Sequence, residues 1–332
     1  MFHTPAKALP DLNSLLRQVS RTFALSIEQL PSPLDRIITV AYLLFRIADT
    51  IEDHPLLPNQ RKTELLSLWI DILNNRSDIR MLFDQTADLA PDKHDMAVIR
   101  QAESIIHALK NLPEQPQNIL VSNVCATSRG MIKWQKKGPF MQTEEDMDDY
   151  MHYVAGQVGY LLTDVFCWYS PELNKNHRML YRLGHEFGLA LQTVNIIRGL
   201  HSDFERGWVF VPKSFLNRAG LTADSLFTAQ NTSNTLALID HLIEKAKKHL
   251  KSGLSYITLL PRKERKIRLF CIWPLLFAVK TLDLTRNNKK ALLSEAKISR
   301  RQVKTIIAVS SMISFSNMLL KKYYYFLGKK IF

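Results

Sequence analysis

Two aspartates four residues apart are the first residues of the sequence whose types and spacing could bind a metal ion. Asp49 and Asp53 belong to the stretch Ala41–Asp53, AYLLFRIADTIED, in which apolar residues recur at helical spacing. Residues i and i+4 of a helix lie on one face, so both carboxylates project from the same side, about one turn apart. Tyr42 and Arg46 lie on or beside this stripe.

Neighbouring carboxylates repel each other unless a cation lies between them, and Mg²⁺ is the natural ion for this pair. It takes oxygen ligands, keeps several waters and binds through one or two carboxylates together with substrate phosphates. Arg46, one turn before Asp49, would either pair with the carboxylates or hold a phosphate oxygen. The alternative is that Asp49 and Asp53 form only the polar end of a surface helix, which runs into a turn at His54 and Pro55.

A second stretch, from about Glu186 to Arg206, is also predicted to be helical and carries polar residues on one stripe. Asn195, Gly199 and Asp203 lie four residues apart in it, with Arg198 beside them. Since the neighbouring residues are apolar, these polar groups would be buried without partners unless they line a cleft. A glycine in mid-helix costs roughly 1 kcal/mol relative to alanine, so Gly199 requires either close packing or a lost function as its explanation.

The composition predicts an all-α fold in which these two helices are held. Of 332 residues, 46% are hydrophobic and 23% charged, a balance that excludes disordered, collagenous and polytopic membrane chains. Glycines number only 11 and alternating β-branched runs are scarce, so we expect helices and a single domain over residues 1–332. Gly207 predicts the end of the second helix, and Trp208–Pro212 a short non-helical segment after it. The three cysteines lie far apart in apolar surroundings and indicate neither a disulfide framework nor a zinc cluster.

Positive charge is concentrated in the C-terminal third. The formal net charge is +13, and residues 241–332 hold 21 lysines and arginines against four acidic residues. Residues 305–320 are uncharged but shorter and more polar than the roughly 20 apolar residues of a membrane span. Lysine pairs and aromatic residues alternate in the rest of the tail, residues 305–332, which predicts contact with an anionic membrane surface. The alternative is a packed C-terminal helix with a frayed basic tail.

Other classes of partner and compartment are not indicated. The sequence contains no nucleic-acid-binding motif, so we expect no nucleic acid partner. The N-terminal residues MFHTPAKALPDLN contain no apolar signal region, and we therefore expect a cytoplasmic protein that associates peripherally with a membrane.

Several motifs in one order over about residues 14–305 resemble the squalene/phytoene synthase family of head-to-head prenyltransferases. In chain order they are Ser20–Phe23, Asp49–Asp53, Tyr150–Gly159, Gln192–Arg198, Phe270–Pro274 and Lys297–Arg300. Ser20–Phe23, SRTF, is similar to the N-terminal diphosphate-binding segment of the family. The last two, FCIWP and KISR, resemble the squalene synthase branch in particular.

The resemblance implies an isoprenoid synthase fold, with a central cavity between two aspartate-bearing helices. Two farnesyl diphosphates would bind there with Mg²⁺. The first loses diphosphate to leave an allylic cation, and the second attacks it to give the cyclopropylcarbinyl compound presqualene diphosphate. Squalene synthases rearrange and reduce this intermediate with NADPH. The alternatives are a phytoene- or dehydrosqualene-type synthase, and a catalytically weak or inactive homologue with a binding or assembly role.

The resemblance also assigns individual roles. Tyr150 matches the tyrosine that handles a proton and stabilises the cation, because its hydroxyl can hydrogen-bond and its ring presents a π-face. The residues that match metal ligands are Asp49, Asp53, Asn195 and Asp203, of which the three aspartates also count as catalytic. The residues that match substrate contacts are Ser20, Arg21, Phe23, Tyr42, Arg46, Gln192, Asn195 and Arg198. The residues that match NADPH contacts are Asn288, Lys297 and Arg300, although basic residues there could equally serve a membrane surface.

The second aspartate motif departs from the family pattern. Gly199 stands where the motif has its first aspartate, and Ser202 where an acidic residue usually precedes the second, so only Asp203 remains. His201 lies about 200° from Gly199 around the helix and is not expected to ligate a metal. This missing ligand is the reason for keeping an inactive homologue among the alternatives.

Overall fold

The computed structural model describes residues 11–89, 94–293 and 296–332. Within these ranges the chain forms helices and no β-strand, and an isolated parallel bridge pairs Phe140 with Val209. The predicted all-α fold is therefore confirmed. The chain divides into two compact units, Met1–Ile132 and Lys133–Phe332, and each is considered by itself below. The organisation as a single domain stays a prediction.

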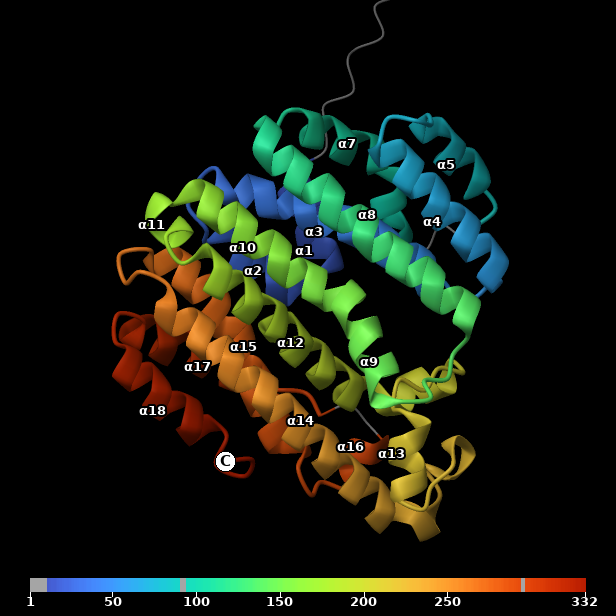
Figure 1. The fold of residues 1–332 in the computed structure, drawn as a ribbon, viewed down its shortest axis with the longest axis vertical. Coiled ribbons are helices and arrows are strands. Elements are labelled where there is room, and N and C mark those ends of the chain that lie inside the picture. Colours follow the sequence, from blue (N-terminus) through green and yellow to red (C-terminus); the bar gives the residue numbers. More distant parts are fainter. Residues whose placement is uncertain (1–10, 90–93, 294–295) are drawn as a thin grey trace, which may run out of the picture. The chain divides into compact units, whose positions relative to one another are not determined.

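The first unit is arranged around α3, Leu34–Glu52, which packs against α1, α2, α4, α6 and α7 (Figure 1). The other helices of the unit are α1 Leu12–Val19, α2 Arg21–Glu28, α4 Asn59–Leu73, α5 Ile79–Gln85, α6 His94–Arg100, α7 Ala102–Lys110 and most of α8 Glu114–Lys137. The helix predicted at Ala41–Asp53 is confirmed as the C-terminal part of α3. Asp53 is its C-cap, and the Asp53 N–H donates to the Asp49 carbonyl at 2.8 Å.

The second unit is arranged around the long helix α12, His177–Glu205, which lies along α10 and α14 (Figure 1). α15 packs on α12 and α14, and α17 and α18 pack on α15. The helices of this unit besides α12 are α9 Glu144–Met151, the π-helix His152–Gly156, α10 Gln157–Tyr169, α11 Pro171–Asn174, α13 Lys213–Arg218, the 3-10 turns Ala223–Ser225 and Ala229–Asn231, α14 Thr232–Leu259, α15 Arg265–Thr285, α16 Lys290–Leu293, α17 Arg300–Ile313 and α18 Asn317–Leu327.

Glycines let the Tyr150–Gly159 segment touch α12 backbone to backbone. A β-carbon on Gly159 would lie 2.0 Å from the carbonyl oxygen of Gly184, and one on Gly188 would lie 2.2 Å from that of Ala155. Any side chain at these positions would overlap the opposite backbone, so only glycine permits the crossing. The contact fixes the segment that carries Tyr150 against the helix that carries Asn195 and Asp203.

α12 ends as the sequence predicts. Gly207 adopts a positive φ of 79°, a conformation that glycine adopts without strain. The chain then turns back, and the Trp208 N–H donates to the Asp203 carbonyl at 2.9 Å. The Val209 N–H donates to the Pro139 carbonyl at 3.1 Å, and Trp208–Pro212 is non-helical. The prediction of a terminating glycine and a short non-helical segment is confirmed.

The uncharged stretch at residues 305–320 is divided between two helices. It covers the end of α17 and the start of α18, with a break between Ile313 and Asn317. No helix in the ranges that the structure describes is both long enough and apolar enough to cross a membrane. All three cysteines are buried and unpaired.

Candidate active site

The polar stripe predicted on α3 is the unburied face of that helix. Over residues 37–52 every residue is buried except Tyr42, Arg46 and Asp49. Their spacing of four and then three residues places them on one face, and the exposed Asp53 continues it by four. An amphipathic surface helix would expose a wider polar face. The narrow stripe therefore favours a dedicated site over the polar end of a surface helix.

The C-terminal turn of α3 concentrates negative charge. Asp49, Glu52 and Asp53 occupy or follow the last turn, which contains no basic residue. A helix C-terminus carries partial negative charge, so each acidic group there is unfavourable by about 0.3–1 kcal/mol. A bound cation would offset this cost, and carboxylate oxygens are the ligands that Mg²⁺ prefers.

The donors present fit a magnesium ion that is shared with a phosphate ligand. Nowhere in the described ranges do three or more His, Cys, Asp or Glu side chains converge on one metal position. Magnesium usually binds through only one or two carboxylates, with phosphate oxygens and waters completing its shell. Asp49 and Asp53 can supply that number from one turn of α3.

The N-terminal segment lies against the α3 stripe. Ser20 is the N-cap of α2, and its Oγ accepts a hydrogen bond from the Phe23 N–H at 3.3 Å. The ring of Phe23 lies 5.8 Å from the ring of Tyr42, centroid to centroid. Two of the predicted substrate contacts, from different motifs, are thus adjacent. Arg21 begins α2, and its side chain lies outside the described part of the structure.

On α12 the predicted stripe is confirmed as an unburied face. Asn195 and Arg198 are exposed, and Gly199 and Asp203 are half-buried. The apolar residues that alternate with them are buried. The Asn195 amide donates to the Gln192 side-chain oxygen at 3.3 Å, so these two predicted contacts are also adjacent. That the stripe lines a cleft stays a prediction.

Asp203 has a cationic neighbour one turn further along the chain. Its Oδ1 lies 2.5 Å from a guanidinium nitrogen of Arg206. Its Oδ2 lies 3.1 Å from the point where a β-carbon on Gly199 would stand, and the three atoms nearest to that point all belong to the Asp203 carboxylate. A carboxylate can rotate away, so close packing does not explain Gly199. A lost function stays the predicted explanation of Gly199.

Tyr150 lies in a stack of aromatic rings. It is 7% exposed, and the Trp134 ring meets it edge-on with centroids 6.0 Å apart. Phe210 stacks on it at 4.8 Å with an interplanar angle of 22°, and Trp208 stacks on Phe210 at 5.6 Å. The π-face of an aromatic ring stabilises a nearby cation, and a stack of rings excludes water from its surroundings.

Sequence reasoning missed the partners of Tyr150. Trp134 and Phe210 are 16 and 60 residues away from it along the chain. The alternation Trp208-Val209-Phe210 offered a signal, because every second residue of an extended segment points to the same side. Trp134 is also held by a hydrogen bond from its indole N–H to Asp149 Oδ2 at 2.9 Å.

A π-helix, His152–Gly156, follows Tyr150 immediately. Such segments are rare and often mark functional sites. His152 Nδ1 lies 3.0 Å from His185 Nε2, and Gln157 Nε2 lies 3.1 Å from His152 Nε2. A β-carbon on Gly156 would lie 2.6 Å from the His185 ring, so this glycine makes room for the histidine pair. Burial, and then the neighbouring His185, lower the pKa of His152.

The predicted NADPH contacts divide into two kinds. Asn288 has local partners, because its amide donates to the Leu284 carbonyl at 2.9 Å and its Oδ1 accepts from the Lys290 N–H at 3.1 Å. Lys297 and Arg300 are exposed at the start of α17, whose first turn contains no acidic residue. All three assignments stay predictions.

Comparison with known proteins identifies the family. The squalene/phytoene synthase family model matches residues 16–302, and the chain belongs to this family. The squalene synthase of Saccharomyces cerevisiae is 31% identical over 293 residues, which are 86% of this chain and 63% of the yeast protein. Squalene synthase 1 of Arabidopsis thaliana is 26% identical over 291 residues, 86% of this chain and 67% of the plant protein. The chain thus spans less than two thirds of its yeast relative.

Solved structures confirm the fold. The structure of TcSQS in complex with a ligand superposes on this chain with a TM-score of 0.83 at 22% sequence identity. The match covers 97% of this chain and 91% of the TcSQS chain. A dehydrosqualene synthase, also in complex with a ligand, gives a TM-score of 0.61 at 19% identity and covers 94% of each chain. The predicted isoprenoid synthase fold is confirmed.

Proposed function

We propose that the protein is a prenyltransferase that condenses two farnesyl diphosphates head to head, through presqualene diphosphate, to squalene. The observation that carries the proposal is the Tyr42, Arg46, Asp49 and Asp53 stripe on the otherwise buried α3. Membership of the squalene/phytoene synthase family and the likeness to curated squalene synthases support it.

The diphosphate groups bind at the charged ends of the two helices in this proposal. Asp49 and Asp53 of α3 would hold Mg²⁺, Asn195 and Asp203 of α12 are assigned the role of metal ligands as well, and the metal would supply charge neutralisation for the leaving diphosphate. Arg46 and Arg198 lie on the same stripes as these ligands. Arginine forms charge-assisted, often bidentate hydrogen bonds with phosphate oxygens, so these side chains orient the diphosphate. Arg21 is assigned the same role.

The reacting carbon atoms lie next to Tyr150 in this proposal. Its ring stabilises the allylic cation, and its hydroxyl accepts and returns a proton during cyclopropane formation. Trp134 and Phe210 hold the ring from two sides and keep water from the cation. Phe23 and Tyr42 add aromatic surface for the prenyl chain.

Reduction and product release complete the proposal. NADPH binds near the start of α17, where Lys297 and Arg300 attract its phosphates and Asn288 contributes polar contact. Squalene is an apolar hydrocarbon and must leave into lipid. Release into lipid is consistent with the expected peripheral contact of a cytoplasmic protein with an anionic membrane.

A product assay tests the reaction. The purified protein is incubated with farnesyl diphosphate and Mg²⁺, with and without NADPH, and the products are identified by mass spectrometry. Squalene is expected only with NADPH. Asp49→Asn is expected to lower kcat by roughly a hundredfold or more, since it removes charge that acts on the leaving group. The matched control is Asp84→Asn, an exposed helical aspartate outside the stripe. Product that forms equally in Asp49→Asn would contradict the proposal.

A non-catalytic homologue with a binding or assembly role is the second candidate. Gly199 and the pairing of Asp203 with Arg206 favour it, because both leave the second motif short of metal ligands. Absence of product from wild type and its appearance in Gly199→Asp would establish this candidate. A phytoene- or dehydrosqualene-type synthase would instead show as product from geranylgeranyl diphosphate, or as an unreduced product from farnesyl diphosphate.

A further inference from the structure

A buried lysine of α14 lies against the helix that carries Tyr150. The side chain of Lys245 is 9% exposed, and its ammonium nitrogen lies 2.7 Å from Glu144 Oε1 and 2.7 Å from Asp148 Oδ1. Both carboxylates belong to α9 and lie four residues apart, on one face of that helix. Lys245 thus bridges two successive turns of α9 from a helix that is distant in the sequence.

The ammonium of Lys245 keeps its charge although it is buried. Burial by itself lowers the pKa of this group, but the contacts with Asp148 and Glu144 outweigh burial and hold the pKa above its usual value. A buried ion pair adds little net stability, because both groups lose their hydration. The same loss makes any arrangement that separates the charges costly. The contact therefore favours one position of α9.

α9 depends on contacts of this kind because it is short and strongly acidic. It has eight residues, of which five are Asp or Glu and none is basic. Isolated helices shorter than about 12 residues are marginal in water. Like charges on adjacent turns of a helix also repel each other. The position of α9 must therefore be set by other elements.

Two other lysines pair with α9, and both are more exposed. Lys133 Nζ lies 2.7 Å from Asp149 Oδ1, and its side chain is 50% exposed. Lys137 Nζ lies 2.5 Å from Asp146 Oδ1, and its side chain is 41% exposed. Exposed ion pairs contribute little, because water screens them. Of these three lysines, Lys245 is the one whose burial lets it fix the helix.

Tyr150 projects from the other side of α9. It is two residues beyond Asp148, about 200° around the helix, and therefore points away from Lys245. On that side Trp134 meets the Tyr150 ring edge-on and Phe210 stacks on it. α9 is thus held between a charged contact behind it and aromatic contacts in front.

We propose that Lys245 is a positioning residue for Tyr150, which holds α9 so that the ring stays stacked on Phe210 beside the reacting carbon atoms. The proposal rests on the proposed function, in which this ring stabilises the allylic cation. Small displacements of a catalytic group lower turnover steeply. The diphosphates bind at other residues, so loss of Lys245 should lower kcat and leave KM nearly unchanged.

Steady-state kinetics with farnesyl diphosphate test the role in the full chain. Lys245→Met is expected to lower kcat about tenfold or more, with less than about a twofold change in KM. Lys245→Arg keeps the charge and can pair with both carboxylates, so it should recover much of the lost turnover. Asp148→Asn removes one of the two partners, is expected to give an intermediate loss, and replaces Lys245→Met if that variant does not fold.

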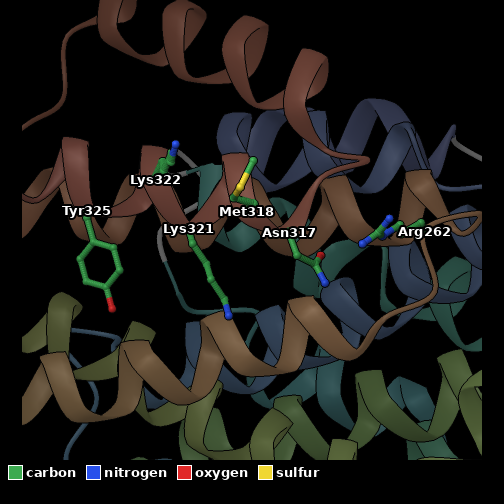
Figure 2. A pocket seen from close by; sticks show the side chains of 6 residues that line it. All are labelled: Arg262, Asn317, Met318, Lys321, Lys322 and Tyr325. Carbon is green, nitrogen blue, oxygen red and sulfur yellow. The ribbon is translucent and has the colours of Figure 1, made fainter.

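Two variants elsewhere in the second unit remove the same charge as controls. Lys247 also lies on α14, but it pairs with Glu244 of its own helix at 2.8 Å. Arg262 lies in the loop after α14, and Figure 2 shows it at one end of a groove along α18. This groove is lined by Arg262, Asn317, Met318, Lys321, Lys322 and Tyr325. Lys247→Met and Arg262→Met should keep kcat within about twofold of wild type, and thermal melts confirm that each variant is folded.

Fluorine NMR reports on the ring without any turnover. Meta-fluorotyrosine incorporated at position 150 alone is expected to give one resonance in wild type, because the ring is held between Trp134 and Phe210. Lys245→Met is expected to shift or split this resonance, and Lys247→Met to leave it unchanged. A shifted resonance in a chain that forms no product would support the positioning role and refute the proposed function, so the two failures are distinguishable.

Several outcomes would overturn the proposal. One is a folded Lys245→Met variant with the kcat and the fluorine resonance of wild type. Another is a loss of kcat in Lys245→Met while the resonance stays that of wild type, because the loss would then not act through Tyr150. Equal losses of kcat in Lys245→Met and Lys247→Met, or no recovery in Lys245→Arg, would also contradict it.

Discussion

Oδ2 of Asp203 lies 3.1 Å from the position that a β-carbon on Gly199 would take, and no other group lies nearer to that position. A β-carbon therefore fits here if the carboxylate rotates slightly. Glycine is unfavourable in the middle of α12, and packing does not require it. Position 199 thus has room for a β-carbon once the Asp203 carboxylate moves slightly.

Gly199→Ala is expected to stabilise the protein by about 0.5–1 kcal/mol, because alanine lowers the conformational entropy of the unfolded chain and favours the helix. Urea unfolding at constant m-value measures the change. The matched control is Gly159→Ala, where the added carbon would lie 2.0 Å from the Gly184 carbonyl oxygen and must destabilise. A stability loss in Gly199→Ala would show that the site has less room than the structure gives it.

Gly199→Asp is expected to make Mg²⁺ stabilise the protein more strongly than it does in wild type. Without Mg²⁺ the new carboxylate lies four residues from Asp203 and should cost about 0.2–0.5 kcal/mol through like-charge repulsion. With Mg²⁺ and diphosphate, the pair can share the ion, so the melting temperature of the variant should rise more than that of Gly199→Ala. Equal shifts in the two variants would mean that this position does not contribute a metal ligand.

Phe210→Leu is expected to lower kcat about tenfold or more under the proposed function, while the protein stays folded. Loss of the stacked ring removes about 0.5–1.5 kcal/mol of aromatic interaction and lets Tyr150 shift, and small misplacements of a catalytic group are costly. Phe204→Leu is the control, because Phe204 is half-buried and contacts Phe227 instead of Tyr150. Both variants should lose similar stability, and only Phe210→Leu should lose turnover. Equal turnover losses would assign Phe210 a merely structural role.

The sequence predicted those parts of the site that depend on local periodicity. The stripe of Tyr42, Arg46 and Asp49 follows from helical spacing alone, and so does the unburied face of α12. The turn after α12 follows from Gly207, whose positive φ is a property of the residue type.

Contacts between distant segments could not be predicted in this way. Tyr150 meets Phe210 only because Gly207 turns the chain back beside α9, and the glycine contact between α10 and α12 needs both helices in register. The number of lysines and arginines in the C-terminal third also overestimates the positive charge on the surface. It includes Arg268, which is buried and holds backbone carbonyls, so part of the C-terminal charge has a structural role.

Acidification from about pH 7.5 to 5.5 is expected to destabilise the second unit through His152. Burial and the neighbouring His185 hold the pKa of His152 below its usual 6.5, so the folded protein binds fewer protons than the unfolded chain. Stability from this group is complete above pH 6.5 and is lost as the pH falls toward the lowered pKa. Midpoints of urea unfolding, measured from about pH 7.5 to 5.5, test this expected loss of stability. His152→Gln should flatten the profile, and His107→Gln, at an exposed position on α7, should not.

Glu186 should change the pH dependence of stability in a separate and more acidic pH range. Contacts with His185 and His249 hold the pKa of this carboxyl well below its usual 4.5, and His249 Nδ1 lies 2.7 Å from Glu186 Oε2. The folded state therefore resists protonation here, and the stabilising contribution is lost as the pH falls below about 4.5. A profile of Glu186→Gln that differs from wild type only above pH 6 would contradict this assignment.

Arg268→Met is expected to lower the free energy of unfolding by at least about 3 kcal/mol, because it leaves the buried carbonyls of Ile257, Leu260 and Ser314 without their charged donor. Arg268→Lys keeps the positive charge, but an ammonium lacks the planar, forked set of donors of a guanidinium. It should therefore recover only part of the lost free energy of unfolding. Limited proteolysis locates the effect, with new cleavage expected between α17 and α18 in both variants. Arg265→Met is the control, since Arg265 is partly exposed and contacts Ser311 and Ser314 from outside. Similar losses from Arg265→Met and Arg268→Met would show that burial of the guanidinium is not what holds the helix pair.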